Sequence, residues 1–148
     1  MLVRRQTIIG PLCLETMGST LVRLYLPTEA PHAPLPTPGG AAAAYFEQID
    51  EYLLGRRRHF DIPVLLPPHI TRTGKLILQR IAAIPYGCTA TYGSLGPPRV
   101  VGHICATNPL PLIIPCHRVV PAHHAPGQYR GGTELKCSLL HLEATMRH

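Results

Sequence analysis

The sequence has no long apolar run and no Cys-x-x-Cys motif. A membrane-spanning helix needs roughly 18 consecutive apolar residues, whereas the longest apolar region, residues 110–114, is interrupted by Pro111. The apolar run that follows Arg4 and Arg5 is broken by Pro11, which argues against a secretory signal. The missing Cys-x-x-Cys pair argues against a zinc ribbon and a thioredoxin-like site. We therefore expect a soluble protein of the cytoplasm.

The cysteines and histidines lack the spacing of a metal site. The five cysteines are odd in number, and neither they nor the nine histidines have ligand spacing on one helix face or across a short loop. We therefore expect no metal and no cofactor. Four of the cysteines are interpreted as small apolar residues, although a disulfide among them stays open for a hyperthermophile; they are Cys13, Cys88, Cys105 and Cys137.

Acidic residues are few, and this shortage gives the chain a positive charge. Eight Asp and Glu face 14 Lys and Arg, for a formal net charge of +6. A basic balance favours a polyanionic partner such as nucleic acid or a membrane surface, without choosing between them. Hydrophobic residues make up 45% of the 148 residues, which is enough for one compact core or two small ones.

The amino-terminal half has the pattern of a small sheet with a helix. Alternation predicts a strand over residues 20–26, reached through a turn at 17–19 from an incoming strand at 12–14. Residues 27–40 are rich in proline and glycine and are predicted to be a loop. Helical spacing of apolar residues predicts a helix over 41–57.

The composition changes at Pro67 and Pro68, where we place a domain boundary. Residues 61–68 have the pattern of a strand that leads into this junction. Beyond it, Thr71 or Thr73 can cap a helix over 74–84. The predicted domains are residues 1–67, which contain the proline-rich loop, and residues 68–148.

Two short helices are predicted in the second half. Thr91 can cap a helix that begins at Tyr92, and residues 96–98, Gly-Pro-Pro, end it. A second helix follows over 99–106, with Pro98 near its first turn. Two helices joined by a tight turn in a basic protein suggest a helix-turn-helix.

A Cys-His pair lies at the centre of an apolar segment. Residues 113–120 read Ile-Ile-Pro-Cys-His-Arg-Val-Val. A thiol is a poor nucleophile until it loses its proton, so a reactive Cys116 needs a base or a cation nearby, and His117 is adjacent. The alternative is a buried cysteine beside a surface histidine.

The surroundings of this pair resemble the O6-alkylguanine-DNA alkyltransferases. That family has a Pro-Cys-His-Arg-Val segment, which stands here at residues 115–119. The likeness continues in the same order along the chain, in Ile-Pro-Tyr-Gly at 84–87, Thr-Tyr-Gly at 91–93, Arg-Val-Val-Gly at 99–102, Asn-Pro-Leu-Pro at 108–111, Tyr-Arg-Gly-Gly at 129–132, and Lys136, Leu139, Leu140 and Glu143. Several motifs in one order are the context that a single motif needs.

The resemblance implies an α+β fold of two small domains and a single-turnover DNA repair reaction. The first domain would be a ribonuclease H-like sheet with a helix, and the second a helical, winged-helix-like domain with the helix-turn-helix. Cys116 would accept, irreversibly, an alkyl group from O6-alkylguanine, with O4-alkylthymine as an open second substrate. His117 and Glu143 would activate the thiol, and Tyr129 would stabilise the departing guanine.

The resemblance also implies how DNA would be bound. The partner would be double-stranded DNA with an O6-alkylguanine, held through its minor groove without sequence preference, and no membrane. Arg99 would fill the gap left by the extruded base, and Tyr92 would push the target phosphate. Asn108 would act as a structural hinge between the helix-turn-helix and the active-site turn. The protein would act as a monomer, with cooperativity on DNA left open.

Four further residues are assigned to the substrate pocket, namely Pro115, Val119, Arg130 and Lys136. Arg130 departs from the family pattern, which often has a small hydroxyl residue there that contacts the lesion oxygen. The stretch from Tyr92 to Arg99 is also shorter than in the family. Three alternatives remain: a non-catalytic binder of alkylated DNA, a hydrolytic cysteine enzyme, and a helix-turn-helix regulator without chemistry.

Overall fold

The computed structural model describes residues 1–123 and 127–146, and the chain divides into two compact units. The first unit is Met1–Pro67 and the second is Pro68–His148. Their described residues contain a three-stranded sheet, one short strand pair and helices, so the fold is of the mixed α/β kind.

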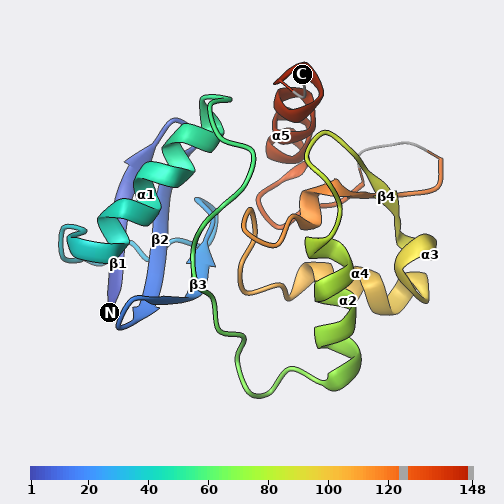
Figure 1. Cartoon of the computed structure of the whole chain (residues 1–148), viewed down its shortest axis with the longest axis horizontal. Helices are drawn as coiled ribbons and strands as arrows, with labels where there is room; N and C mark the ends of the chain where they lie inside the picture. Colours follow the sequence, from blue (N-terminus) through green and yellow to red (C-terminus); the bar gives the residue numbers. More distant parts are fainter. Residues whose placement is uncertain (124–126, 147–148) are drawn as a thin grey trace. The chain divides into compact units, whose positions relative to one another are not determined.

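The first unit is built on a three-stranded antiparallel sheet in the order β1-β2-β3 (Figure 1). The strands are β1 (Leu2–Thr7), β2 (Gly10–Met17) and β3 (Thr20–Tyr25). Gly18 has φ of +61° in the turn between β2 and β3, a conformation that glycine adopts without steric cost. The predicted hairpin is confirmed, whereas β1 was not expected from the sequence.

Helix α1 (Gly40–Leu53) covers one face of this sheet (Figure 1). Its buried positions recur at helical spacing, and Phe46 and Ile49 are fully buried. The predicted helix over 41–57 exists but ends at Leu53, because Gly55 has φ of +76°, which ends the α conformation. No helix or strand lies within residues 27–39, as predicted for the loop.

The strand predicted over residues 61–68 is wrong. Only one isolated parallel bridge forms, between Leu21 and Val64, through Leu21 N–H to Pro63 O (2.9 Å) and Leu65 N–H to Leu21 O (3.1 Å). Three prolines in this segment, at positions 63, 67 and 68, have no N–H to donate to a neighbouring strand. Val64 and Leu65 are also exposed, so no core contact holds the segment in a sheet.

The second unit begins with α2 (Arg72–Ala82). Thr71 is its N-cap, as one of the two predictions had it, and its hydroxyl accepts a hydrogen bond from Gly74 N–H (3.0 Å). A short parallel pair, β4 (Ala90–Thr91) with β5 (Val119–Val120), brings two distant segments together. Helix α5 (Thr133–Met146) follows.

The two predicted short helices are present (Figure 1). They are α3 (Tyr92–Leu95), with Thr91 as its N-cap, and α4 (Pro98–Ala106), with proline in its first turn. Helix α3 has only four residues, in keeping with the short stretch noted between Tyr92 and Arg99. Among the described residues, no helix is long and apolar enough to span a membrane.

Candidate active site

Cys116 lies at the start of a tight turn in the second unit. Residues Cys116–Arg118 form a single 3₁₀ turn, η1, which directly precedes β5. Pro115 enters the turn with φ of −79°, a value close to that fixed by its ring, and Arg118 N–H donates to Pro115 O (2.9 Å). The Cys116 side chain is almost fully buried, with only 3% of the residue exposed.

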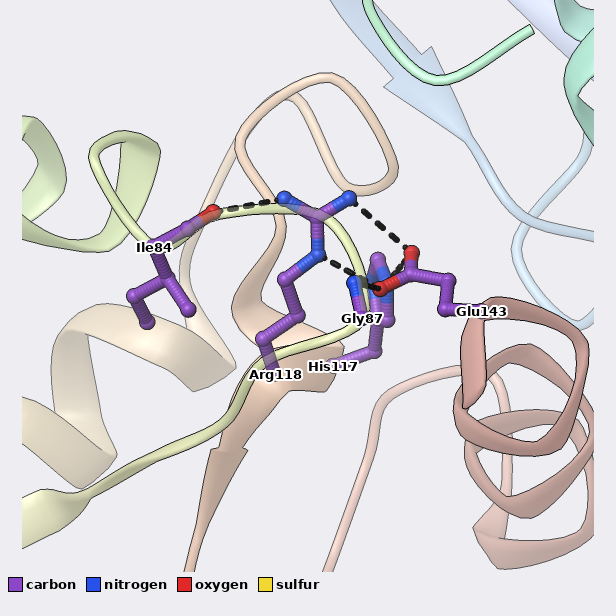
Figure 2. Close-up of polar contacts among 5 residues, drawn as sticks. All are labelled: Ile84, Gly87, His117, Arg118 and Glu143. Carbon is purple, nitrogen blue, oxygen red and sulfur yellow. Dashed lines mark hydrogen bonds and ion pairs between the residues drawn. The ribbon is translucent and has the colours of Figure 1, made fainter. Parts of the chain in front are cut away.

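The other two residues of the turn contact one carboxylate on α5 (Figure 2). His117 Nε2 lies 2.7 Å from Glu143 Oε2, and Arg118 Nε donates to Glu143 Oε1 at 2.7 Å. Arg118 Nη2 donates to Glu143 Oε2 (3.0 Å), so the guanidinium binds both carboxylate oxygens. Its Nη1 donates to Ile84 O (2.7 Å), which fixes the plane of the guanidinium.

This network is buried, and burial sets the protonation state of the imidazole. His117, Glu143 and Arg118 are all buried, the first completely. Burial lowers the pKa of His117 below its ordinary value, and this effect exceeds the opposing attraction of Glu143. His117 is therefore neutral at neutral pH. A carboxylate only accepts hydrogen bonds, so the imidazole proton belongs on Nε2 and the basic lone pair on Nδ1.

The thiol of Cys116 is also shifted by its surroundings. Burial raises its pKa, while the Asn108 side chain and the positive charges of Lys136 and Arg130 lower it. Burial is the largest of these effects, so the resting group is a protonated thiol. A reaction at this sulfur therefore needs a base to remove the proton as attack begins.

Cys116 opens onto a cavity of about 850 Å³. Four other residues singled out in the sequence lie in its wall: Tyr92, Arg99, Tyr129 and Arg130. The ring of Tyr129 stands edge-on to that of His117, with 6.4 Å between the ring centres. The cavity thus brings together the predicted nucleophile, the tyrosine assigned to the leaving group and the two residues assigned to DNA.

Other predicted site residues lie behind the cavity rather than in its wall. His117 and Glu143 belong to the buried network, and Pro115, Val119 and Lys136, assigned to the pocket, are not among its lining residues. Lys136 is fully buried, and its Nζ donates to Val119 O (2.7 Å) and Gln128 O (3.2 Å). The carbonyl of Val119, a residue assigned to the pocket, therefore contacts this lysine.

Asn108 connects the end of α4 with the segment that leads to Cys116. It is 1% exposed, and its Nδ2 donates to Ile114 O at 2.9 Å. Its Oδ1 accepts from Leu110 N–H, also at 2.9 Å. Both bonds hold residues 108–114 in a compact turn whose last residue, Ile114, accepts from Cys116 N–H (2.8 Å).

Sequence reasoning missed two features of this site. Arg118 was assigned no role of its own, although it binds Glu143 as closely as His117 does. Cys105 lies in the cavity wall, and burial raises its pKa to about 12. The signal for Cys105 was its place six residues after Arg99 and three after Gly102, which puts these α4 positions near one helix face.

Comparison with known proteins agrees with this geometry. Residues 73–145 match the family model described as the DNA-binding domain of 6-O-methylguanine DNA methyltransferase. A methylated-DNA–protein-cysteine methyltransferase of Mycobacterium bovis is 34% identical, over 91% of this chain and 87% of the relative. That of Mycobacterium leprae is 35% identical with the same coverage.

Solved structures give the same picture. The crystal structure of Mycobacterium tuberculosis OGT in complex with DNA has a TM-score of 0.88 and 30% identity, covering 98% of this chain and 93% of that one. A Pyrococcus kodakaraensis O6-methylguanine-DNA methyltransferase, with a TM-score of 0.60 and 21% identity over 97% of this chain and 99% of that one, shares the fold. The family model and the relatives define the class of this protein as a methyltransferase that acts on DNA. This chain belongs to the methylated-DNA–protein-cysteine methyltransferase family.

Proposed function

We propose that the protein repairs DNA by moving an alkyl group from O6-alkylguanine to Cys116 in a single turnover. The observation that carries this proposal is that Cys116 lines the cavity while its neighbour His117 is held by Glu143 at 2.7 Å. In the reaction the sulfur bonds to the alkyl carbon, and the bond from that carbon to O6 breaks. The product is a stable thioether, so the thiol is not regenerated.

His117 would take the thiol proton. Its Nε2 is committed to Glu143, which leaves Nδ1 as the acceptor, directly or through one water molecule. The carboxylate would stabilise the imidazolium that forms, and Arg118 would keep Glu143 charged and aligned. Arg118 is not among the residues that line the cavity, and it binds both oxygens of Glu143, so its role is to position the carboxylate.

Tyr129 would assist the leaving group. Guanine departs as an anion unless it gains a proton or a hydrogen bond. Tyr129 lines the same cavity as Cys116, where its hydroxyl can donate to the purine, and its proton can be replaced from the imidazolium of His117. The proton lost by sulfur and the proton gained by guanine then balance.

The size of the cavity suits an extruded nucleotide. A volume of about 850 Å³ lies in the upper part of the roughly 300–1,000 Å³ range of ligand pockets. A methylated O6 lies inside a stacked duplex, so the nucleotide must leave the helix first, at a cost of a few kcal/mol. O4-alkylthymine presents the same alkyl–oxygen bond and is a second substrate of this proposal.

Arg99 and Tyr92 would serve the extrusion. Both line the cavity, from the first turns of α4 and α3, and Arg99 would replace the missing base in the stack. We propose that α4 docks in the minor groove without reading sequence, aided by the chain's net charge of +6 and by Asn108 as the hinge behind it. The protein acts as a monomer.

Finer features of the fold are part of the same proposal. A ribonuclease H-like first unit is supported by the antiparallel sheet with α1 against it. A winged-helix-like second unit is supported by the successive helices α3 and α4 with the short β4–β5 pair. The boundary between the units at residues 67 and 68 would then separate a support from a reacting domain.

The proposal is tested with duplex DNA that carries O6-[methyl-³H]guanine. We expect label on Cys116, at most one equivalent per chain, with no turnover. Cys116→Ala should take up no label and still bind DNA. Cys137→Ala, which removes an exposed thiol of α5 outside the cavity, is the matched control and should be labelled like the parent.

The same experiment separates the alternatives. A non-catalytic binder would hold the damaged duplex but stay unlabelled, and a regulator without chemistry would show no preference for the lesion. A hydrolytic enzyme would release label into solution over many turnovers. Any of these three results contradicts the proposal.

A further inference from the structure

Arg130 joins the loop that carries Tyr129 to the end of α4. Its Nη1 donates to Asn108 O at 2.6 Å, across 22 positions of the sequence. Asn108 itself holds Ile114, two residues before Cys116, through its side chain. One short chain of contacts therefore runs from the Tyr129 loop through Arg130 and Asn108 to the turn that presents the sulfur.

The same loop has a second cationic attachment. Lys136 Nζ donates to Gln128 O and to Val119 O, and so ties the loop to β5, just beyond the 3₁₀ turn. Gly127 precedes these contacts with φ of +77°, and a Cβ there would meet Pro121 Cδ at 2.9 Å. The described part of the loop is thus held on both sides of Tyr129, by a lysine and an arginine.

Arg130 differs from Lys136 in where its side chain lies. Arg130 lines the cavity onto which Cys116 opens, whereas Lys136 does not. Its positive charge favours the ionised form of the Cys116 thiol, and so lowers the pKa that burial raises. A guanidinium stays charged throughout the accessible pH range, so this attraction does not depend on the pH of the solution.

We propose that Arg130 is a positioning residue for alkyl transfer: its guanidinium fastens the Tyr129 loop to Asn108 and keeps a permanent positive charge in the cavity wall beside the reacting sulfur. This proposal rests on the alkyl-transfer function proposed above. It assigns to Arg130 a task different from that of Arg99, the other arginine of the cavity wall, which is assigned to DNA.

The test compares the parent protein with Arg130→Gln and Arg130→Lys. Two rates are measured against pH: transfer from the free base O6-benzylguanine, which needs no DNA, and alkylation of Cys116 by iodoacetamide, followed by peptide mapping. The second rate reports on the thiol even if the protein transfers nothing. Arg72→Gln is the matched control, because it removes one positive charge from an exposed position outside the cavity.

We expect Arg130→Gln to shift both pH profiles upward. Each unit of higher thiol pKa lowers the thiolate fraction about tenfold near neutral pH, while the more basic thiolate reacts about threefold faster, so the net loss is about threefold. At high pH, where the thiol is ionised in both proteins, iodoacetamide should react with the variant as fast as with the parent or faster. Arg130→Lys should keep the parent's profile, and so should Arg72→Gln.

Three results would overturn the proposal. One is a loss of both rates in Arg130→Gln that is equal at every pH, which would indicate a role in folding or shape alone. Another is an Arg130→Lys profile as shifted as that of Arg130→Gln, and the third is an equal shift in Arg72→Gln. If the parent takes up no label from the methylated duplex while the iodoacetamide profile shifts as expected, the proposed function fails and the effect of Arg130 on the thiol stands.

Discussion

The two units of the chain bury different kinds of side chain. In the described part of the first unit, the only buried polar residue is Thr16, and the core consists of apolar and aromatic side chains of the sheet and α1. Among the described residues of the second unit, five polar or charged ones are buried close to one turn, Asn108, His117, Arg118, Lys136 and Glu143. Buried charge costs free energy unless it is paired and hydrogen-bonded, so the second unit accepts a cost that the first avoids.

This difference locates the chemistry. An apolar core can be replaced by many others of similar volume, whereas a buried His–Glu–Arg network requires each partner in place. The ion pairs of the first unit lie at the surface instead, as in Arg5–Asp50, where the side chains are 41% and 30% exposed. We therefore expect the same type of substitution to have very different effects in the two units.

Removal of the shared carboxylate should have the largest effect. Glu143→Ala leaves His117 and Arg118 buried without their common partner, and the free energy of unfolding of the second unit should fall by about 3–5 kcal/mol. Urea denaturation followed by circular dichroism measures this loss. A loss below about 1 kcal/mol would show that the network is solvated in solution.

Acid should weaken the second unit through the same network. Burial lowers the pKa of His117 in the folded state, so the unfolded chain binds a proton more readily. The stabilisation is complete above the pKa of histidine in the unfolded chain, about 6.5, and is lost as the pH falls below that value. As the pH is lowered across this range, the urea concentration at the denaturation midpoint should fall in the parent and should fall less in His117→Gln. An unchanged slope in the variant would assign the acid sensitivity to another group.

The helix caps give a smaller contrast. Thr71 caps α2 through its hydroxyl, whereas Gly39 precedes α1 without a side-chain hydrogen bond. Thr71→Ala should lower the free energy of unfolding of the second unit by about 1 kcal/mol, and Gly39→Ser should raise that of the first by a few tenths of a kcal/mol. Thermal melts of both variants measure these changes, and equal effects of the two substitutions would contradict the assignment of the caps.

The surface ion pair should matter least. Asp50→Ala removes the partner of Arg5, whose Nη2 lies 2.7 Å from Asp50 Oδ2. Because both side chains are partly exposed, the free energy of unfolding should fall by roughly 0.2–1 kcal/mol, and by less at high salt. Urea denaturation at two salt concentrations measures it. A loss as large as that of Glu143→Ala would erase the contrast between the units.

Local signals in the sequence were enough for much of the fold. The hairpin at Gly18, the Thr91 cap and a helix that begins within one residue of Pro98 depend on a few neighbouring residues and were predicted, and Thr71 was one of two caps expected for α2. The failures depend on distant contacts. Strand β1 has the run Arg4-Arg5-Gln6, which obscures its alternation, and it is a strand because it pairs with β2.

In the candidate site too, the sequence identified the residues but not the properties that depend on packing. The resemblance selected Cys116, His117 and Glu143, and the structure brings the last two to 2.7 Å across 26 positions of the sequence. The sequence could not show that burial keeps the Cys116 thiol protonated, because desolvation depends on how the whole unit packs. Nor could it show that Arg130 contacts Asn108, since that bond depends on the path of the loop.

The 3₁₀ turn of residues Cys116–Arg118 also determines the directions in which its three side chains point. With three residues per turn, successive side chains point about 120° apart, so the sulfur can face the cavity while imidazole and guanidinium face the interior. Insertion of one residue between Cys116 and His117 would change the angle between the sulfur and the other two side chains by one such step, so the three could no longer face these same surroundings. The order Cys-His-Arg is therefore a geometric requirement as much as a chemical one.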